Sequence, residues 1–381
     1  MKYKNLGPII LVVVLSFYLG GCENPFNSSA NKKTQIKASK ENNIQNVNKL
    51  NKVEISQKNE ELLQSKINDY LVGNGLSGSV FMARDNKVLF NGSVGYANVE
   101  KKLLNQPSTT YPIGSITKIF VATSIMKLQE EHKLNIQDPV SKYISNFPNG
   151  NKIKLYNLLT HTSGLQRPHW KNGDSTPLSL IQDIEKMPLK FQPGEKWDYE
   201  DINYMVLGYI LEKVSKTSLH QFIKENIIDK AQLKETGFIT HEHPVPYTSV
   251  GYLSKNNTVQ RTEYLNTDLL YACGDIYSTA SDLAKFDKAL MSGKLVSKNS
   301  LIQMLTSSPR SSYGLGLYIK GDEALSNGVL GGWLTTHSYF KDNTQIVVLL
   351  NNNNNSIHID KISLAIYQIV KESQNQEIPK Q

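Results

Sequence analysis

Hydrophobic and polar positions change their period along the chain, and these changes divide it into predicted elements. From Glu60 to Val72 the apolar residues recur at helical spacing and fall on one side of the predicted helix. Two alternating segments follow, Gly78 to Arg84 and Val88 to Gly95, and the polar pair Asp85-Asn86 between them predicts a tight turn. The folded part therefore begins with a helix that leads into a β-hairpin.

The middle of the chain has a helical pattern, whereas its last quarter returns to strands. Loops rich in Pro and Gly separate the helical segments. The remaining predicted elements are helices at Ile119–Glu131 and Tyr204–Val214, extended segments at Tyr313–Ile319, Trp333–Phe340 and Gln345–Leu350, and a closing amphipathic helix at Ile357–Val370.

Strands at both chain ends with helices between them predict a fold of mixed α/β (α+β) class. We expect an α/β sandwich assembled from residues 59–115 and 266–375, into which a mainly helical part, residues 116–265, is inserted. A cleft between the two parts is the expected ligand site.

The N-terminus has the pattern of a bacterial lipoprotein signal. Lys2 and Lys4 precede an apolar run that is about half as long as a membrane span requires, and small residues stand directly before Cys22. We expect residues 1–21 to be a signal peptide and Cys22 to carry a lipid, which would anchor the protein to the outer face of a Gram-positive-type cell membrane. Residues 22–58 are polar and nearly free of aromatics, which predicts a flexible tether.

Net charge gives no evidence for a nucleic-acid partner. The chain has 381 residues and a formal charge of +8, but six of these charges belong to the signal peptide and tether. The folded part is therefore nearly neutral. The two cysteines of the whole chain, Cys22 and Cys273, fit neither a disulfide framework nor a zinc site.

A serine and a lysine three residues apart provide the first candidate chemistry. Ser115 and Lys118 would lie on one helical face, with the hydroxyl beside the amine, as a nucleophile and base require. The spacing alone is weak evidence, because it also occurs at Ser29, Ser124 and Ser338.

Five segments in order single out Ser115 and resemble the serine beta-lactamase and penicillin-recognising family, in particular the branch with class C beta-lactamases, D-alanyl-D-alanine peptidases and related esterases. The resemblance covers about residues 60 to 370 and implies an antiparallel sheet flanked by helices. The segments are Tyr111 to Lys118, Asp138 to Tyr143, Leu158 to Leu165, Pro193 to Asp201 running into Leu207-Gly208, and Ser278 to Leu283.

This resemblance implies a serine hydrolase that works through an acyl-enzyme. Ser115 is the implied nucleophile, and Lys118 and Tyr199 are implied to move the proton. A lysine can act as the base if burial or a neighbouring cation lowers its pKa. One oxyanion donor is implied to be the N–H of Ser115, and the other comes from a strand whose motif reads Lys or His, any residue, Gly.

The strand motif departs from the family pattern. We place it at Gly328–Trp333, where Gly331 and Gly332 would let backbone approach the substrate and Trp333 would line the site. The cation of the motif is then missing, because Val stands at position 329.

Several other polar residues are interpreted as structural. His241 and His243 flank a Pro-rich loop without a third ligand, so no metal or cofactor is expected. The structural residues are His161 in a turn, Asp138 and Asp282 as caps, and Cys273 as a small buried residue.

Two departures from the family pattern bear on the substrate. The second motif normally ends in Asn but here ends in Asp201, and the strand cation is absent. Both changes disfavour a substrate carboxylate and favour an ammonium, as in D-alanyl esters of teichoic acid. They resemble FmtA-type D-alanyl esterases, and we expect Asp201 to pair with the ammonium. A D-alanyl-D-alanine carboxypeptidase or beta-lactamase acting on peptidoglycan or beta-lactams, and a non-catalytic wall-binding lipoprotein, remain as alternatives.

Overall fold

The computed structural model describes residues 58–170, 175–255, 258–262, 265–354 and 357–375. The predicted signal peptide, Cys22 and nearly all of the tether lie outside these residues and stay predictions. Contacts group the chain from Asn59 onward into one compact unit. Among the described helices, none combines the length and the apolar character needed to cross a membrane.

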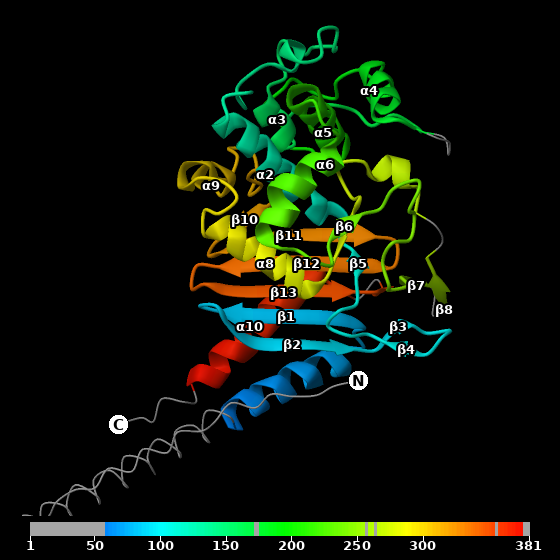
Figure 1. Ribbon diagram of the computed structural model, residues 1–381, viewed down its shortest axis with the longest axis vertical. Coiled ribbons are helices and arrows are strands. Elements are labelled where there is room, and N and C mark those ends of the chain that lie inside the picture. The colour runs from blue at the N-terminus through cyan, green and yellow to red at the C-terminus, as the bar shows by residue number, and fades with distance from the viewer. Residues whose placement is uncertain (1–57, 171–174, 256–257, 263–264, 355–356, 376–381) are drawn as a thin grey trace, which may run out of the picture. The chain divides into compact units, whose positions relative to one another are not determined.

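A six-stranded antiparallel sheet forms the centre of this unit (Figure 1). Its order, β10-β11-β12-β13-β1-β2, places strands from the C-terminal quarter beside the N-terminal hairpin. Gly78 pairs with Leu350 on one side of β1 and with Val94 on the other. The strands are β1 (Gly78–Arg84), β2 (Lys87–Val94), β10 (Tyr318–Lys320), β11 (Glu323–Leu330), β12 (Trp333–Phe340) and β13 (Thr344–Leu350).

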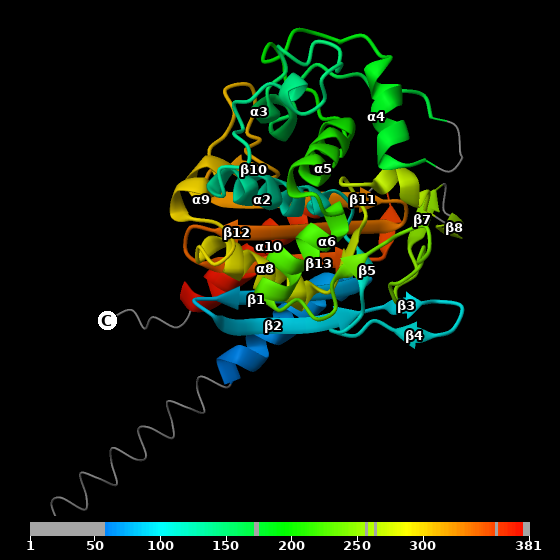
Figure 2. The same ribbon diagram turned by 45° about the horizontal axis from the view of Figure 1, so that its top comes forward.

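The sheet is buried on both faces. Neighbouring residues of a strand point to opposite sides, and helices cover each side. Val348 and Leu350 of β13 pack against α10 (Ile359–Asn375) and the helix over residues 58–73. Val347 and Leu349 face the larger core, to which α8 (Ala280–Met291) belongs. Figure 1 and Figure 2 show α8 and α10 on opposite faces of the sheet.

The segment between β2 and β10 contains most of the described helices and shares its core with the sheet. Apolar side chains of α2 and α5 join Val347 and Leu349 in one cluster. The helices are η1 (Gly114–Ile116), α2 (Thr117–Glu130), η2 (Val140–Lys142), α3 (Leu155–Leu159), α4 (Pro177–Glu185), α5 (Ile202–Ser215), α6 (Leu219–Ile223), η3 (Lys224–Ile228), α7 (Asp229–Ala231), η4 (Thr267–Leu270) and α9 (Lys298–Met304).

Three small sheets hold the connecting loops. They bring segments from different parts of the chain to the edge where β11 and β12 turn. The first joins β5 (Tyr111–Pro112), β9 (Ile276–Ser278) and β6 (Gly237–Phe238), the second β14 (Asn352–Asn354), β7 (Tyr252–Lys255) and β8 (Thr258–Arg261), and the third β3 (Tyr96–Asn98) and β4 (Leu103–Leu104).

One predicted element differs from the structure, and one observed strand was not predicted. The extended segment at Tyr313–Ile319 is mostly loop, and only Tyr318–Lys320 forms a strand. Leu315 and Leu317 are both buried around Gly316, whose φ of 90° interrupts a strand. The strand β11 was not predicted as a complete element.

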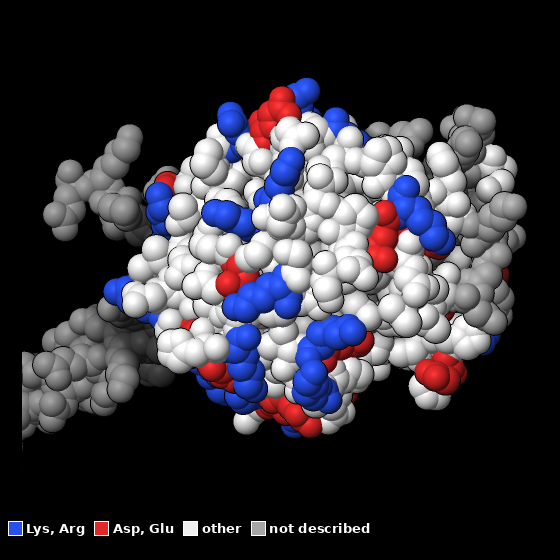
Figure 3. Space-filling model, turned by 90° about the horizontal axis from the view of Figure 1, so that it is seen from above, with Lys and Arg blue, Asp and Glu red and all other residues white. Residues whose placement is uncertain are grey.

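On the face shown in Figure 3, Lys and Arg side chains are interspersed with Asp and Glu.

Candidate active site

Ser115 and Lys118 lie on one continuous helical segment and contact each other. Ser115 belongs to η1, and Lys118 follows in the first turn of α2. The Lys118 Nζ donates to Ser115 Oγ at 3.0 Å. The pairing predicted from the three-residue spacing is therefore present.

The competing Ser-x-x-Lys matches are engaged elsewhere. The Ser124 hydroxyl donates to the carbonyl of Phe120 within α2, at 2.9 Å. The Ser338 hydroxyl shares a hydrogen bond with Ser363 at 2.8 Å, between β12 and α10. Ser29 lies outside the described residues.

The Lys118 amine is fully buried and surrounded by three acceptors. They are Ser115 Oγ at 3.0 Å, Asp201 Oδ1 at 2.8 Å and the carbonyl of Cys273 at 3.0 Å, which match the three N–H groups of an ammonium. Burial lowers the pKa of Lys118, but Tyr199 and Asp201 outweigh it and raise the pKa above its ordinary value. The lowered pKa that a lysine base requires is therefore not found, and Lys118 is an ammonium here.

Tyr199 lies beside this ammonium in an aromatic cluster. The Lys118 Nζ is 5.1 Å from the centre of its ring. The ring packs on His161 at 4.2 Å between centroids and lies nearly perpendicular to Tyr313 at 6.0 Å. Within the described part of the chain, no protein group hydrogen-bonds to the Tyr199 hydroxyl.

His161 positions Tyr199 and is itself buried. Its Nδ1 accepts the backbone N–H of Glu200 at 3.2 Å, one residue beyond Tyr199. Burial, followed by the Lys118 charge, lowers the pKa of His161 well below its ordinary value, so the ring is neutral. The predicted structural role fits this environment.

Asp201 is held between two cations at the start of α5. Its Oδ1 accepts from Lys118, and its Oδ2 accepts from Arg167 Nη2 at 2.6 Å. Burial raises the pKa of this carboxyl, but Lys118 and Arg167 outweigh it and lower the pKa to about 2. Asp201 is therefore ionised at neutral pH, and neither oxygen is without a cation.

This arrangement corrects the expectation that Asp201 offers a free anion to the substrate. An incoming ammonium would have to share or displace Arg167, whose side chain is 48% exposed. Arg167 also pairs with Glu200, at 3.3 Å. Arg167 therefore supplies a cation to the site, although the strand motif has none. Sequence analysis could not identify Arg167, because it is one loop residue without a motif.

The edge of β11 lies against η1 and supplies backbone donors. A Cβ placed on Gly114 would lie 3.2 Å from the Val329 nitrogen. Leu330 and Trp333 form the hydrogen-bonded pair that closes a two-residue hairpin. In an antiparallel pair every second residue bonds to the partner strand, so the N–H of Val329 points away from β12, to the other edge of β11. Pairing with β10 stops at Leu325, which leaves that edge open beside Ser115.

The glycine that approaches η1 is Gly328, so the predicted position of the strand motif is wrong by three residues. A Cβ on Gly328 would lie 2.0 Å from the carbonyl oxygen of Ile113. Gly331 and Gly332 instead form the hairpin turn, where Gly332 N donates to Thr262 Oγ1 at 2.7 Å. The possible cation positions in the two registers are Ser326 and Val329, so neither register supplies a Lys or His.

The contacts of Asp282 and Asp138 differ from the capping roles predicted for them. The cap of α8 is Thr279, whereas Asp282 accepts the backbone N–H of Glu235 at 2.7 Å. Asp138 accepts the Tyr143 hydroxyl at 2.5 Å in a turn. Among the residues that the structure describes, no group of His, Cys, Asp and Glu is arranged to hold a metal ion.

Comparisons with known proteins agree with this geometry. The beta-lactamase family model matches residues 63–365. The chain is 37% identical to the penicillin-binding-protein-like PbpX of Bacillus subtilis (strain 168), over 91% of this chain and 89% of that protein. It is 32% identical to a protein of Staphylococcus aureus (strain MRSA252) named teichoic acid D-alanine hydrolase, over 76% and 74%.

Solved structures show the same fold. The crystal structure of FmtA from Staphylococcus aureus has a TM-score of 0.73 and 30% identity, and the match covers 81% of this chain and 89% of that one. A D-amino acid amidase from Ochrobactrum anthropi SV3 has a TM-score of 0.73 at 20% identity, over 83% and 99%, which is evidence for the fold alone. The chain belongs to the beta-lactamase family and is a serine hydrolase of the beta-lactamase/transpeptidase-like fold.

Proposed function

We propose that this protein removes D-alanyl groups from their ester linkage to teichoic acid, at the outer face of a bacterial membrane. The observation that carries the proposal is the chain of contacts from Ser115 Oγ through Lys118 to the ionised Asp201, at a site whose β11 edge has no cation. A relative 32% identical to this chain is named for that activity.

Ser115 is the proposed nucleophile toward the ester carbonyl carbon. Because Lys118 is an ammonium, it donates to Ser115 Oγ and does not take its proton. The Tyr199 oxygen receives this proton, and the centre of the Tyr199 ring lies 5.1 Å from Lys118 Nζ. The N–H groups of Ser115 and Val329 stabilise the oxyanion of the tetrahedral intermediate.

Collapse of this intermediate breaks the ester bond. The polymer alkoxide leaves with the proton held by Tyr199, and D-alanine stays bound to Ser115 as an acyl ester. A water molecule then attacks the acyl carbon and gives its proton to the Tyr199 oxygen. The bond to Ser115 breaks, Ser115 Oγ takes that proton back, and D-alanine is released.

Recognition of the substrate ammonium involves Asp201 and Arg167 together. The ammonium of a D-alanyl ester approaches Asp201 Oδ2, which now accepts from Arg167. A half-exposed arginine can swing away without exposing a buried charge. We expect Arg167→Ala to lower KM for a D-alanyl ester, because a competing cation is removed. A raised KM would show instead that Arg167 binds the substrate.

The test compares three substrates under one set of conditions: a D-alanyl ester of poly(glycerol phosphate), a D-alanyl-D-alanine peptide and a chromogenic cephalosporin. We expect fastest turnover of the ester and none with Ser115→Ala. Faster release of D-alanine from the peptide would overturn the proposal in favour of a carboxypeptidase, and rapid cephalosporin turnover in favour of a beta-lactamase. Absence of Ser115-dependent fluorophosphonate labelling would favour a wall-binding protein.

One observation favours the carboxypeptidase or beta-lactamase as the second candidate. Arg167 places an exposed guanidinium beside Asp201, and a guanidinium is suited to a substrate carboxylate. Two existing carboxylate partners, Glu200 and Asp201, oppose this use.

The membrane anchor is a separate part of the proposal. The apolar run before Cys22 and the polar residues 22–58 support a lipid anchor and a tether. Incorporation of a labelled fatty acid into the wild-type chain, and its loss in Cys22→Ala, would be the expected result. Equal labelling of both would contradict it.

A further inference from the structure

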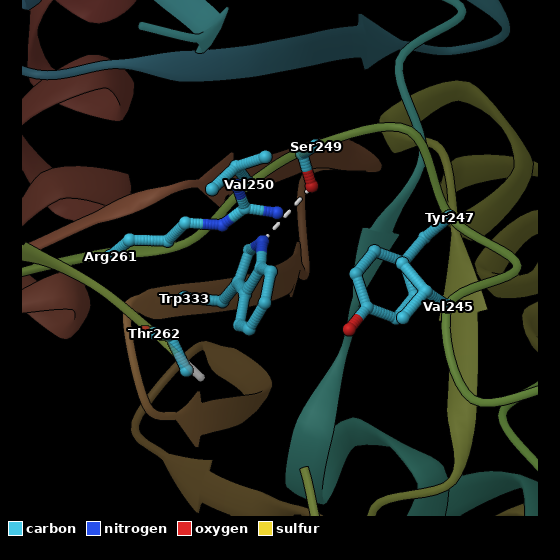
Figure 4. Close-up of a pocket in the computed structure, with 7 residues that line it drawn as sticks. All are labelled: Val245, Tyr247, Ser249, Val250, Arg261, Thr262 and Trp333. Carbon is cyan, nitrogen blue, oxygen red and sulfur yellow. Dashed lines mark hydrogen bonds between the residues drawn. The ribbon is translucent and has the colours of Figure 1, made fainter. Parts of the chain in front are cut away.

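A cavity lies beside the β11–β12 turn. Its volume is about 640 Å³. Figure 4 shows Arg261, Tyr247 and Trp333 around this space. The lining residues are Val245, Tyr247, Ser249, Val250, Arg261, Thr262 and Trp333.

The aromatic wall of this cavity is fixed in place. Trp333 is 3% exposed, and its indole N–H donates to Ser249 Oγ at 2.9 Å. The Tyr247 ring stands nearly perpendicular to the indole, with 5.3 Å between centroids. Thr262 is tied to the turn through the Gly332 N–H. The cavity thus has two rigid, partly apolar surfaces.

Arg261 brings a guanidinium to the wall of the cavity. Within the described part of the chain, no carboxylate lies within ion-pair distance of its guanidinium. The Arg261 charge contributes to lowering the pKa of Glu100, whose carboxylate accepts the Tyr252 hydroxyl at 2.5 Å. Arg167 at the active site, in contrast, contacts two carboxylates. Arg261 is therefore available to an anion from outside.

The cavity is connected to the active site through two short segments. The Ser249 N–H donates to the carbonyl of Thr110 at 3.1 Å, and Thr110 precedes Ser115 by five residues. Trp333 follows the same hairpin whose Val329 faces Gly114. Five residues span at most about 17 Å. A polymer held at Ser115 can therefore reach Arg261 with the units next to the one being cleaved.

We propose that this cavity binds a phosphodiester group of the polymer that carries the D-alanyl ester, with Arg261 paired to the phosphate and Tyr247 and Trp333 packed against the adjoining polyol or sugar. This inference rests on the proposed function. The planar guanidinium fits two phosphate oxygens at once, and aromatic rings accept the apolar C–H faces of the polyol. The subsite makes the enzyme prefer a polymer over an isolated ester.

Kinetics with two esters test the subsite. One substrate is D-alanylated poly(glycerol phosphate), and the other is D-alanine methyl ester, which has no phosphate. We expect Arg261→Ala to raise KM for the polymer roughly tenfold at unchanged kcat, and to leave the methyl ester kinetics as they are. Arg261→Lys should recover part of the loss. An unchanged KM for the polymer would overturn the inference.

Lys341→Ala is the matched control. Lys341 carries the same charge, is 74% exposed and follows the far end of β12 from Trp333. Loss of a general attraction to a polyanion would affect both variants alike and would also overturn the subsite. Melting temperatures of all variants show whether the fold is kept.

A binding measurement separates this inference from the proposed activity. Calorimetry uses Ser115→Ala with poly(glycerol phosphate) that carries no D-alanine. We expect binding that weakens about tenfold when Arg261→Ala is added. If the polymer binds in this way but the wild-type protein does not cleave the ester, the result would support the subsite and reject the proposed esterase activity. Arg261-dependent binding of a peptidoglycan fragment in place of the polymer would overturn the subsite.

Discussion

Replacement of Asp201 by Asn removes the charge that keeps Lys118 protonated while it keeps the shape of the side chain. The pair is 2.8 Å long, and the Lys118 side chain has no exposed surface. At an effective dielectric constant of about 20, the Coulomb attraction over this distance is roughly 6 kcal/mol. Part of this is offset, because the wild type also desolvates the Asp201 carboxylate.

The pKa of Asp201 provides a second measure of the same interaction. It falls from the ordinary 3.8 to about 2, which corresponds to about 2 kcal/mol in favour of the ionised carboxyl. Loss of one partner from a buried pair costs about 3 to 5 kcal/mol, and Asn still accepts a hydrogen bond. We therefore expect Asp201→Asn to lower the free energy of unfolding by about 2 to 3 kcal/mol at pH 7.

The sign of the pH dependence follows from the lowered pKa. The carboxylate contributes its stabilisation above the unfolded value near 3.8 and loses it as pH falls toward 2. Urea unfolding of wild type and Asp201→Asn should therefore show a difference at pH 7 that shrinks between pH 4 and pH 2. Asp198→Asn is the control, since its pair with Lys190 is about one third exposed and should be worth less than about 1 kcal/mol. A difference below about 0.5 kcal/mol at pH 7 would refute the reasoning.

Three further predictions concern other parts of the molecule. Tyr199→Phe should lower kcat for the ester by about 10² to 10⁴ with the melting temperature unchanged, as steady-state kinetics and calorimetry can check. Gly328→Ala places a Cβ 2.0 Å from the Ile113 oxygen, so both stability and kcat should fall, as measured by urea unfolding and ester hydrolysis. Burial lowers the pKa of His220, but its bond to Asp275 outweighs this and raises it, so the contribution of His220 to stability should be complete below pH 6.5 and decline as pH rises through the folded value. His220→Gln should lack that decline in urea unfolding from pH 5 to 9.

The regular elements could be predicted from the sequence because their patterns are local. The hairpin of β1 and β2 and the strands β12 and β13 lie within two residues of the predicted segments. The segment before β10 was predicted as a strand because it is rich in apolar residues. Leu315 and Leu317 instead lie in a loop, and their apolar side chains are buried in the core.

The site was predictable only where a motif carries its own spacing. Ser115, Lys118 and Tyr199 were found in this way. The glycine next to Ser115 was placed wrongly, because only its contact with Ile113, more than 200 residues away, distinguishes Gly328 from its neighbours. Arg167 was missed for the same reason, since its partners are reached through folding and not through sequence.

The position of β1 between β2 and β13 sets the order of events during synthesis. Arg84 and Leu350 are 266 residues apart, so the ribosome needs roughly 15 to 50 s to make the chain between them. Until β13 emerges, one edge of β1 has no partner, and Val80 and Met82 have no finished core. In a nascent chain that stops short of β13, the β1–β2 hairpin is not joined to β10, β11 and β12, so the sheet is incomplete. Such a chain is a candidate for aggregation and not for partial activity.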